Sequence, residues 1–229
     1  MVKFLDLNLQ YLSIKKEIDE SIFKVIDSGR FIGGKFIDNF ENEFAKYCES
    51  KFCVGVANCT DALEIAIESF NFDKGSEIIV PSNSFISSSE AITRSGHKVV
   101  FADIKTSDYG ICTDSILKLI TNKTAAIIVV HLYGIPVDID KISAIAQKHK
   151  IKIIEDCAQA HGSTFNNKKV GSFGDIGVFS FYPGKTLGAF GDAGAIVTNN
   201  SDLYLKCKMI KNHGRIDKYN HLFEGRNSR

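Results

Sequence analysis

Short apolar runs alternate with segments of helical periodicity along most of the chain. The apolar runs predict seven strands: Phe52–Val56, Glu77–Val80, Lys98–Ala102, Ala126–Val130, Lys152–Glu155, Gly177–Phe181 and Gly194–Thr198. The segments around them predict five helices: Thr60–Phe70, Ser84–Ser95, Asp114–Ile120, Asp138–His149 and Asp202–Asn212. This alternation predicts an α/β fold of three layers, a mostly parallel seven-stranded sheet with helices on both faces, and ligands at the carboxyl ends of the strands.

Two more helices are predicted ahead of the first strand. Apolar residues recur at helical spacing in Leu7–Asp27 until Ser28-Gly29 ends the pattern, and a second helix follows the loop Arg30–Gly34. The apolar face of that second helix comprises Phe36, Ile37, Phe40, Phe44 and Tyr47. We interpret both helices as packing elements, which makes residues 1–50 a helical segment packed on a larger domain, residues 51–229.

The composition excludes several functional classes. With 44% hydrophobic residues and a formal net charge of +1, the chain is typical of one or two globular domains and gives no sign of a nucleic-acid partner. No apolar run approaches the roughly 18 residues of a membrane span, and the N-terminus lacks the apolar stretch of a signal peptide, so we expect a cytoplasmic protein without membrane contact. The six cysteines form no Cys-x-x-Cys pair and indicate neither a zinc site nor a disulfide framework.

One lysine stands directly after the last long apolar run. The run Phe179–Gly188 is interpreted as a strand that stops at Pro183 and Gly184, whose turn projects Lys185 into the cleft beyond the sheet. A partly buried lysine supplies a nucleophilic amine, which Schiff-base chemistry with a carbonyl cofactor requires. On residue type alone, a solvated surface lysine after a turn is the commoner case.

A second strand end leads into a helix through a short polar turn, Val56–Leu63. Free amides at such a helix start form an anion site that suits a phosphate. Ordinary capping by Asn58, Thr60 or Asp61 explains the same stretch without a ligand. Because an Asp61 carboxylate that faced a phosphate would repel it, we expect Asp61 to cap the helix.

A third strand end delivers a carboxylate, Asp156, from the apolar stretch Ile153–Glu155. A buried aspartate needs a cationic partner, and the protonated ring nitrogen of pyridoxal phosphate would supply one. A salt bridge to lysine or arginine is the alternative, whereas no cluster of metal-ligand spacing surrounds Asp156, so no metal is predicted. Phe85 offers a ring to a planar cofactor or to the core, and Ser180 a hydroxyl to a phosphate or to a strand neighbour.

These stretches resemble the DegT/StrS-type family of nucleotide-sugar aminotransferases, in the fold-type-I pyridoxal-phosphate superfamily. The resemblance covers nearly the whole sequence and includes the order and spacing of the matching stretches. They are Phe4–Leu7, Ser28–Gly34, Ala57–Leu63, Glu155–Gln159, Ser180–Lys185, Gly191–Ala195 and Asn212–Gly214.

The resemblance implies a role for each candidate residue. Lys185 would bind pyridoxal 5′-phosphate as a Schiff base, Asp156 would pair with the ring nitrogen, and Gln159 would contact the ring hydroxyl. The remaining cofactor-binding positions are Thr60 and Ser180 at the phosphate, Cys59 in the same turn as Thr60, Phe85 near the ring face, and Asn227, which would reach the phosphate of a neighbouring subunit in a homodimer. Cys59 stands where similar sequences have glycine, and it is tolerable only if the turn needs no positive φ.

The implied activity is transfer of an amino group from glutamate to a nucleotide-linked keto-sugar, in the synthesis of lipopolysaccharide, capsule or antibiotic sugars. Relatives continue beyond the position of Arg229 into a small C-terminal domain, so we expect the cofactor-binding domain without it, as a fragment or a natural truncation. A catalytically weak sensor that binds the cofactor is the alternative. A plain nucleotide-binding Rossmann protein is disfavoured because the Gly-x-Gly-x-x-Gly motif is missing.

Overall fold

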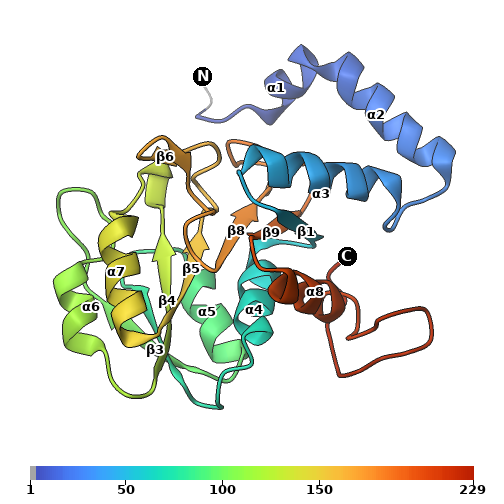
Figure 1. Cartoon of the computed structure of the whole chain (residues 1–229). Helices are drawn as coiled ribbons and strands as arrows, with labels where there is room; N and C mark the ends of the chain where they lie inside the picture. The colour runs from blue at the N-terminus through green and yellow to red at the C-terminus, as the bar shows by residue number, and fades with distance from the viewer. Residues whose placement is uncertain (1–3) are drawn as a thin grey trace.

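The computed structural model describes residues 4–229 as a three-layer α/β body with a helical N-terminal extension (Figure 1). The helices are α1 (Leu7–Ser13), α2 (Lys15–Ser28), α3 (Lys35–Tyr47), α4 (Cys59–Ser69), α5 (Ser87–Arg94), α6 (Thr113–Leu119), α7 (Ile139–His149) and α8 (Ser201–Ile210), with a 3-10 turn, η1 (Leu132–Gly134). The strands are β1 (Phe52–Val56), β2 (Glu77–Pro81), β3 (Lys98–Ala102), β4 (Thr124–Val130), β5 (Lys152–Asp156), β6 (Thr164–Phe165), β7 (Lys168–Lys169), β8 (Ile176–Ser180) and β9 (Gly194–Thr198).

The main sheet has seven strands in the order β1-β9-β8-β5-β4-β2-β3. The five strands from β8 to β3 are parallel to one another, and β9 runs antiparallel to both of its neighbours. The predicted fold class is therefore confirmed. The pattern missed only the two-residue strands β6 and β7, whose antiparallel pair is too short to produce a periodic signal.

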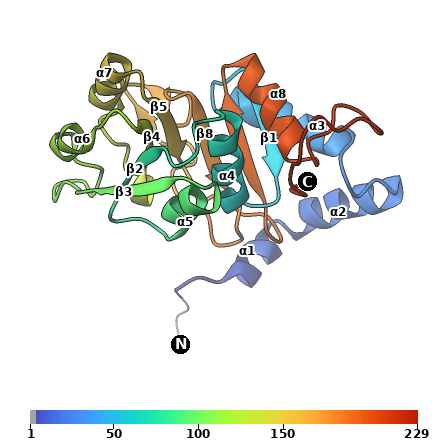
Figure 2. The ribbon, with the colours of Figure 1, turned by 90° about the horizontal axis from the view of Figure 1, so that it is seen from below.

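Alternate residues of each central strand enter different cores. In β4, Ile128 and Val130 pack with α4, α5 and α8, whereas Ile127 and Val129 pack with α6 and α7. Figure 2 shows α4 between α5 and α8 on its face of the sheet. Because both faces are covered, the strands read as continuous apolar runs, and polar groups are left to gather at their carboxyl ends.

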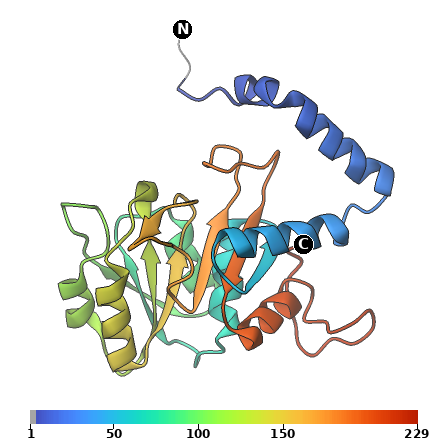
Figure 3. The same cartoon turned by 45° about the horizontal axis from the view of Figure 1, so that its top comes forward.

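The prediction of one continuous N-terminal helix is wrong. The expected single helix over Leu7–Asp27 is interrupted at Ile14, whose φ and ψ of −123° and 18° are not helical. Neither α1 nor α2 contains a buried residue: α1 touches the body through an edge contact of 5.8 Å between the rings of Tyr11 and Phe190, and Figure 3 shows α2 extending away from it. Only α3 packs on the sheet, through Phe44 and Ala45. Periodicity identifies an apolar helix face but does not say what covers it.

Within residues 4–229, no helix combines the length and the apolar character that a membrane crossing requires.

Candidate functional site

A cleft of about 770 Å³ opens at the carboxyl ends of the parallel strands. Its wall comes from the start of α4, the segment from Ser84 into α5, the end of β5 and the loop after β8. Seven of the eight predicted site residues line it: Cys59, Thr60, Phe85, Asp156, Gln159, Ser180 and Lys185. The structure thus brings together residues that are up to 126 positions apart, from Cys59 to Lys185.

Lys185 lies in the loop after β8 rather than at the strand end. The strand stops at Ser180, earlier than the Pro-Gly pair, so the predicted strand is too long. The predicted turn is present, since the Lys185 amide donates to the Tyr182 carbonyl at 2.8 Å. No residue in the described part of the chain forms a hydrogen bond or ion pair with the Lys185 ammonium group, which leaves this amine available to a ligand.

Helix α4 begins with two amides that have no acceptor. Asn58 caps the helix: its Oδ1 accepts from the Asp61 amide at 2.8 Å, and its carbonyl accepts from the Ala62 amide at 3.1 Å. Among residues 4–229, nothing accepts from the amides of Cys59 and Thr60. These two N–H groups, at the positive end of the helix dipole, can bind an anion.

The turn before α4 also shows why a cysteine is accepted there. Cys59 is the first helical residue and has no positive φ, so its side chain causes no backbone strain. The glycine requirement lies instead at Gly194 in β9, where a Cβ would come within 2.5 Å of the Asn58 carbonyl carbon. Burial raises the pKa of the Cys59 thiol well above its usual value, and the Asp156 charge acts in the same direction. Cys59 is therefore a neutral wall residue.

Asp61 does not cap the helix, contrary to the prediction. Its Oδ2 accepts a hydrogen bond of 2.6 Å from the hydroxyl of Ser228, near the other end of the chain. Asn58, one turn earlier, already provides the cap. The sequence gives no signal for this contact because the two residues are 167 positions apart.

Asp156 ends β5 with a buried and incompletely satisfied carboxylate. It accepts from the Ser88 hydroxyl at 2.9 Å and from the Ala158 amide at 3.1 Å. Burial raises its pKa; these two hydrogen bonds and the nearby Lys185 charge oppose the rise without cancelling it. No lysine or arginine of residues 4–229 forms an ion pair with Asp156, so the salt-bridge alternative is not realised. Ser88 was missed, although three consecutive serines at the start of a helix are an unusual signal.

The amide group of Gln159 is oriented by the turn η1. Its Oε1 accepts from the Tyr133 amide at 2.9 Å, and Tyr133 holds a left-handed conformation with a φ of 56°. The acceptor end of the side chain is thereby engaged. The Nε2 group is left as a hydrogen-bond donor at the cleft.

Glu155, the residue before Asp156, belongs to a separate buried network. It accepts from the ring of His131 at 3.0 Å and from the backbone amides of Gly171, Phe173 and Gly174 at 2.6 to 2.8 Å. His131 Nδ1 accepts from the Val137 amide, so Nε2 carries the hydrogen that is donated to Glu155. Burial alone would raise the pKa of Glu155, but the His131 and backbone hydrogen bonds together lower it below the usual value.

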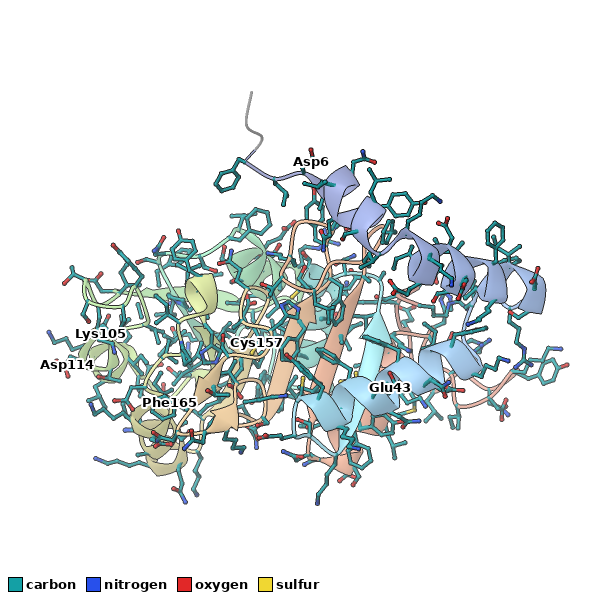
Figure 4. The ribbon with its side chains drawn as sticks, turned by 90° about the horizontal axis from the view of Figure 1, so that it is seen from above. Asp6, Glu43, Lys105, Asp114, Cys157 and Phe165 are labelled. Atoms are coloured by element: carbon teal, nitrogen blue, oxygen red, sulfur yellow. The ribbon has the colours of Figure 1, made fainter. Side chains whose placement is uncertain are left out.

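This network resembles a metal site only in its spacing. One ligand atom each from His131, Glu155 and Cys157 lies within 4.8 Å of the others. The four hydrogen bonds occupy the lone-pair positions of Glu155, and both nitrogens of His131 are engaged. Figure 4 places Cys157 near the centre of the molecule, and burial raises the pKa of its thiol well above the usual value. The three side chains are thus a closed structural cluster.

Phe85 and Ser180, for each of which the sequence left two roles open, have different surroundings in the structure. Phe85 is 73% exposed in the segment between β2 and α5, which begins at Ser87 rather than Ser84, so Phe85 is not a core residue. Ser180 is buried at the end of β8, and its Oγ accepts from the Tyr182 amide at 3.3 Å. Thr60 shares a hydrogen bond of 2.8 Å with Ser87, and both residues line the cleft.

Asn227 is the one predicted residue outside the cleft. It is exposed, and its Oδ1 accepts from the guanidinium group of Arg229 at 2.8 Å. The next residue, Ser228, is fully buried against α4. The backbone near Asn227 is therefore fixed while its own side chain faces outward.

Comparison with known proteins decides the family. The model of the DegT/DnrJ/EryC1/StrS aminotransferase family matches residues 12–229. The chain belongs to this family. The family resemblance seen in the sequence is thereby confirmed.

Relatives within the DegT/DnrJ/EryC1/StrS family are similar over the whole chain. A dTDP-3-amino-3,6-dideoxy-alpha-D-galactopyranose transaminase from Aneurinibacillus thermoaerophilus is 47% identical over 100% of this chain and 63% of its own length. The structure of DesV from Streptomyces venezuelae, in complex with a ketimine intermediate, is 41% identical with a TM-score of 0.97, covering 100% of this chain and 62% of that one. NtdA from Bacillus subtilis, solved with bound cofactor PMP, is 32% identical with a TM-score of 0.92, covering 100% and 52%. The chain thus spans between half and two thirds of the length of these relatives.

Proposed function

We propose that this chain is the cofactor-binding part of a pyridoxal-phosphate-dependent aminotransferase that acts on a nucleotide-linked keto-sugar. The observation that carries the proposal is the meeting of three unsatisfied groups in one cleft: the amine of Lys185, the buried carboxylate of Asp156, and the amides of Cys59 and Thr60. They are complementary to the carbonyl, the ring nitrogen and the phosphate of pyridoxal phosphate. The PMP-bound relative supports the same cofactor.

The polar groups of the cleft then have distinct tasks. Lys185 Nζ holds the cofactor covalently and, when free, is the base that accepts a proton from the substrate carbon and returns it. Asp156 keeps the proton on the ring nitrogen, and Ser88 and the Ala158 amide orient its carboxylate. The bound cofactor supplies an electron sink for the carbon that loses its proton.

The other predicted residues hold the cofactor in place. Thr60 and Ser180 add hydroxyl groups to the two free amides at the phosphate, and Gln159 Nε2 donates to the ring hydroxyl. Phe85 covers one face of the ring, which its exposure in the cleft permits. Asn227 reaches the phosphate of a second subunit in a homodimer, and its outward-facing side chain suits this role.

Substrates and setting are proposed from the family. The transaminase from Aneurinibacillus is named for a dTDP-linked amino sugar, which supports a nucleotide keto-sugar as the amino acceptor. We take glutamate as the amino donor, and amino-sugar biosynthesis for lipopolysaccharide or related glycans, in the cytoplasm, as the setting.

Visible absorption spectroscopy tests the proposal. Pyridoxal phosphate should give an absorption band with the wild-type chain and with the surface control Lys148→Ala, and no such band with Lys185→Ala. Glutamate should convert the band, and a nucleotide keto-sugar should restore it. An absorption band that does not change when glutamate is added would favour the sensor role. A wild-type chain that gives no band with pyridoxal phosphate would contradict cofactor binding.

A further inference from the structure

Helix α4 presents three carboxylates along one stripe, and the end of the chain contacts all three. Asp61, Glu64 and Glu68 follow one another at intervals of three and four residues, which places them on one helix face. Arg226 forms ion pairs with Glu64 and Glu68, and Ser228 donates to Asp61. We refer to residues 226–228 as the C-terminal clamp.

The clamp is held by backbone hydrogen bonds to the end of α8. The Arg226 amide donates to the Ile210 carbonyl at 2.6 Å, and the Ser228 amide donates to the Lys211 carbonyl at 2.9 Å. The Arg226 carbonyl accepts from the His213 amide at 2.9 Å. These bonds fix the position of the Ser228 side chain, which has no exposed surface.

The Ser228 hydroxyl has two partners, and together they determine its direction. Its oxygen accepts from the Ala57 amide at 3.0 Å, at the end of β1. Its hydrogen is directed to Asp61 Oδ2 at 2.6 Å, because an ionised carboxylate can only accept. Within residues 4–229 this is the one hydrogen bond that the Asp61 side chain makes.

Asp61 is the third residue of α4, so its charge lies in the first turn, beside the free amides of Cys59 and Thr60. A carboxylate at this position can turn back and accept from the amide of the N-cap residue, here Asn58, as acidic side chains do in capping boxes. In that conformation its charge would lie beside the anion site and repel a phosphate. Ser228 offers the carboxylate a different hydrogen-bond donor.

We infer that Ser228 is a positioning residue for the phosphate site. It holds the Asp61 carboxylate against the C-terminal clamp and so leaves the two amides free for the cofactor phosphate. This inference rests on the proposed function. It assigns a task to a residue from a distant part of the chain that touches neither the phosphate nor the cofactor.

The test compares two ligands that differ only in the phosphate. Dissociation constants for pyridoxal phosphate and for pyridoxal are measured by absorption titration in wild type, Ser228→Ala and Ser228→Ala/Asp61→Asn. Ser228→Ala should weaken pyridoxal phosphate about tenfold and leave pyridoxal unchanged, because only the phosphate meets the released carboxylate. Asp61→Asn in the same chain should restore the preference. Ser69→Ala, a buried serine at the far end of α4, is the matched control and should change neither constant.

The outcomes separate the inference from the proposed function. Equal weakening of both ligands in Ser228→Ala, or no restoration by Asp61→Asn, would show that Ser228 only supports the fold, and would overturn the inference alone. Should Ser228→Ala not fold, Asp61→Asn by itself decides the question: a preference for the phosphate at or above that of wild type supports the inference, and a tenfold loss overturns it. A wild-type chain that binds neither ligand overturns the proposed function and this inference with it.

Discussion

Glu155 and Asp156 are neighbours at the end of β5, and strand alternation sends their carboxylates to opposite faces of the sheet. Both side chains are almost completely buried. Glu155 accepts four hydrogen bonds, and its pKa lies below the usual value; Asp156 accepts two, and burial raises its pKa. The same chemical group is therefore stabilised as an anion on one face and destabilised on the other.

The difference shows how a structural carboxylate is distinguished from a site for a ligand. The donors around Glu155 come from two segments, His131 after β4 and the loop at Gly171–Gly174, and Glu155 links the two by hydrogen bonds. Asp156 keeps capacity for a further donor and lies in the wall of the cleft. A buried anion in that condition is complementary to a cationic ligand atom.

The largest expected effect is on stability and concerns Glu155, the carboxylate whose hydrogen bonds are all made. Glu155→Gln replaces one acceptor oxygen by an NH₂ group that faces the donors of His131 and the loop, so the free energy of unfolding should fall by about 3 kcal/mol. Urea denaturation measures the loss. The exposed Glu43→Gln on α3 is the control and should stay within about 0.5 kcal/mol of wild type. A loss of less than about 1 kcal/mol for Glu155→Gln would contradict its structural role.

Asp156→Asn should instead abolish chemistry. A neutral amide cannot hold the positive charge on the ring nitrogen, so the single-turnover reaction with glutamate should slow at least about 100-fold while some cofactor still binds. Rapid-mixing absorption spectra follow the conversion. Near-normal conversion would refute the assigned role.

The same substitution should stabilise the cofactor-free chain. With a raised folded pKa, Asp156 binds its proton more tightly in the native state, so its ionisation costs stability as the pH rises through the window between the unfolded and folded pKa values. The asparagine side chain of the variant does not ionise and can keep both hydrogen bonds, so the free energy of unfolding at pH 7 should rise by about 1 kcal/mol. Thermal unfolding without cofactor measures this gain, and a loss of stability would show that the carboxylate is not under-satisfied.

The smallest effect comes from a titratable group on the Glu155 face of the sheet. The ring centroid of His161 lies 5.5 Å from those of Phe179 and Phe181, and burial lowers its pKa to about 4, which outweighs the opposing effect of the Ser180 backbone. The unfolded state binds the proton first, so stability should fall as the pH drops from about 6.5 towards 4.

His161→Phe should reduce this loss, because phenylalanine cannot take up a proton. Unfolding curves between pH 7 and pH 4 measure it, with the exposed His149→Phe on α7 as the matched control. Identical pH dependence in wild type and His161→Phe would show that His161 does not contribute.

The sequence predicted the residues at the strand ends of the site but not the hydrogen-bond partners that are distant in the chain. Lys185, Asp156 and the turn before α4 follow strand ends, where a short-range pattern marks the residue and the fold brings the ends together. Ser88 and Ser228 act through contacts 68 and 167 positions away, which no periodicity encodes. Glu155 and His131 lie at the ends of two adjacent strands, β5 and β4. The other donors to Glu155 are backbone amides of a loop. Because every residue type except proline carries such an amide, the sequence gives no signal for these hydrogen bonds.

The central claim is that the unsatisfied groups of this cleft form a cofactor site built on Lys185. Borohydride reduction of the chain with pyridoxal phosphate, followed by peptide mapping, tests it most directly. The account predicts one stoichiometric label, on the peptide that contains Lys185, and the same label in Glu43→Gln. A label on another lysine, or labelling spread over many lysines at low yield, would contradict it.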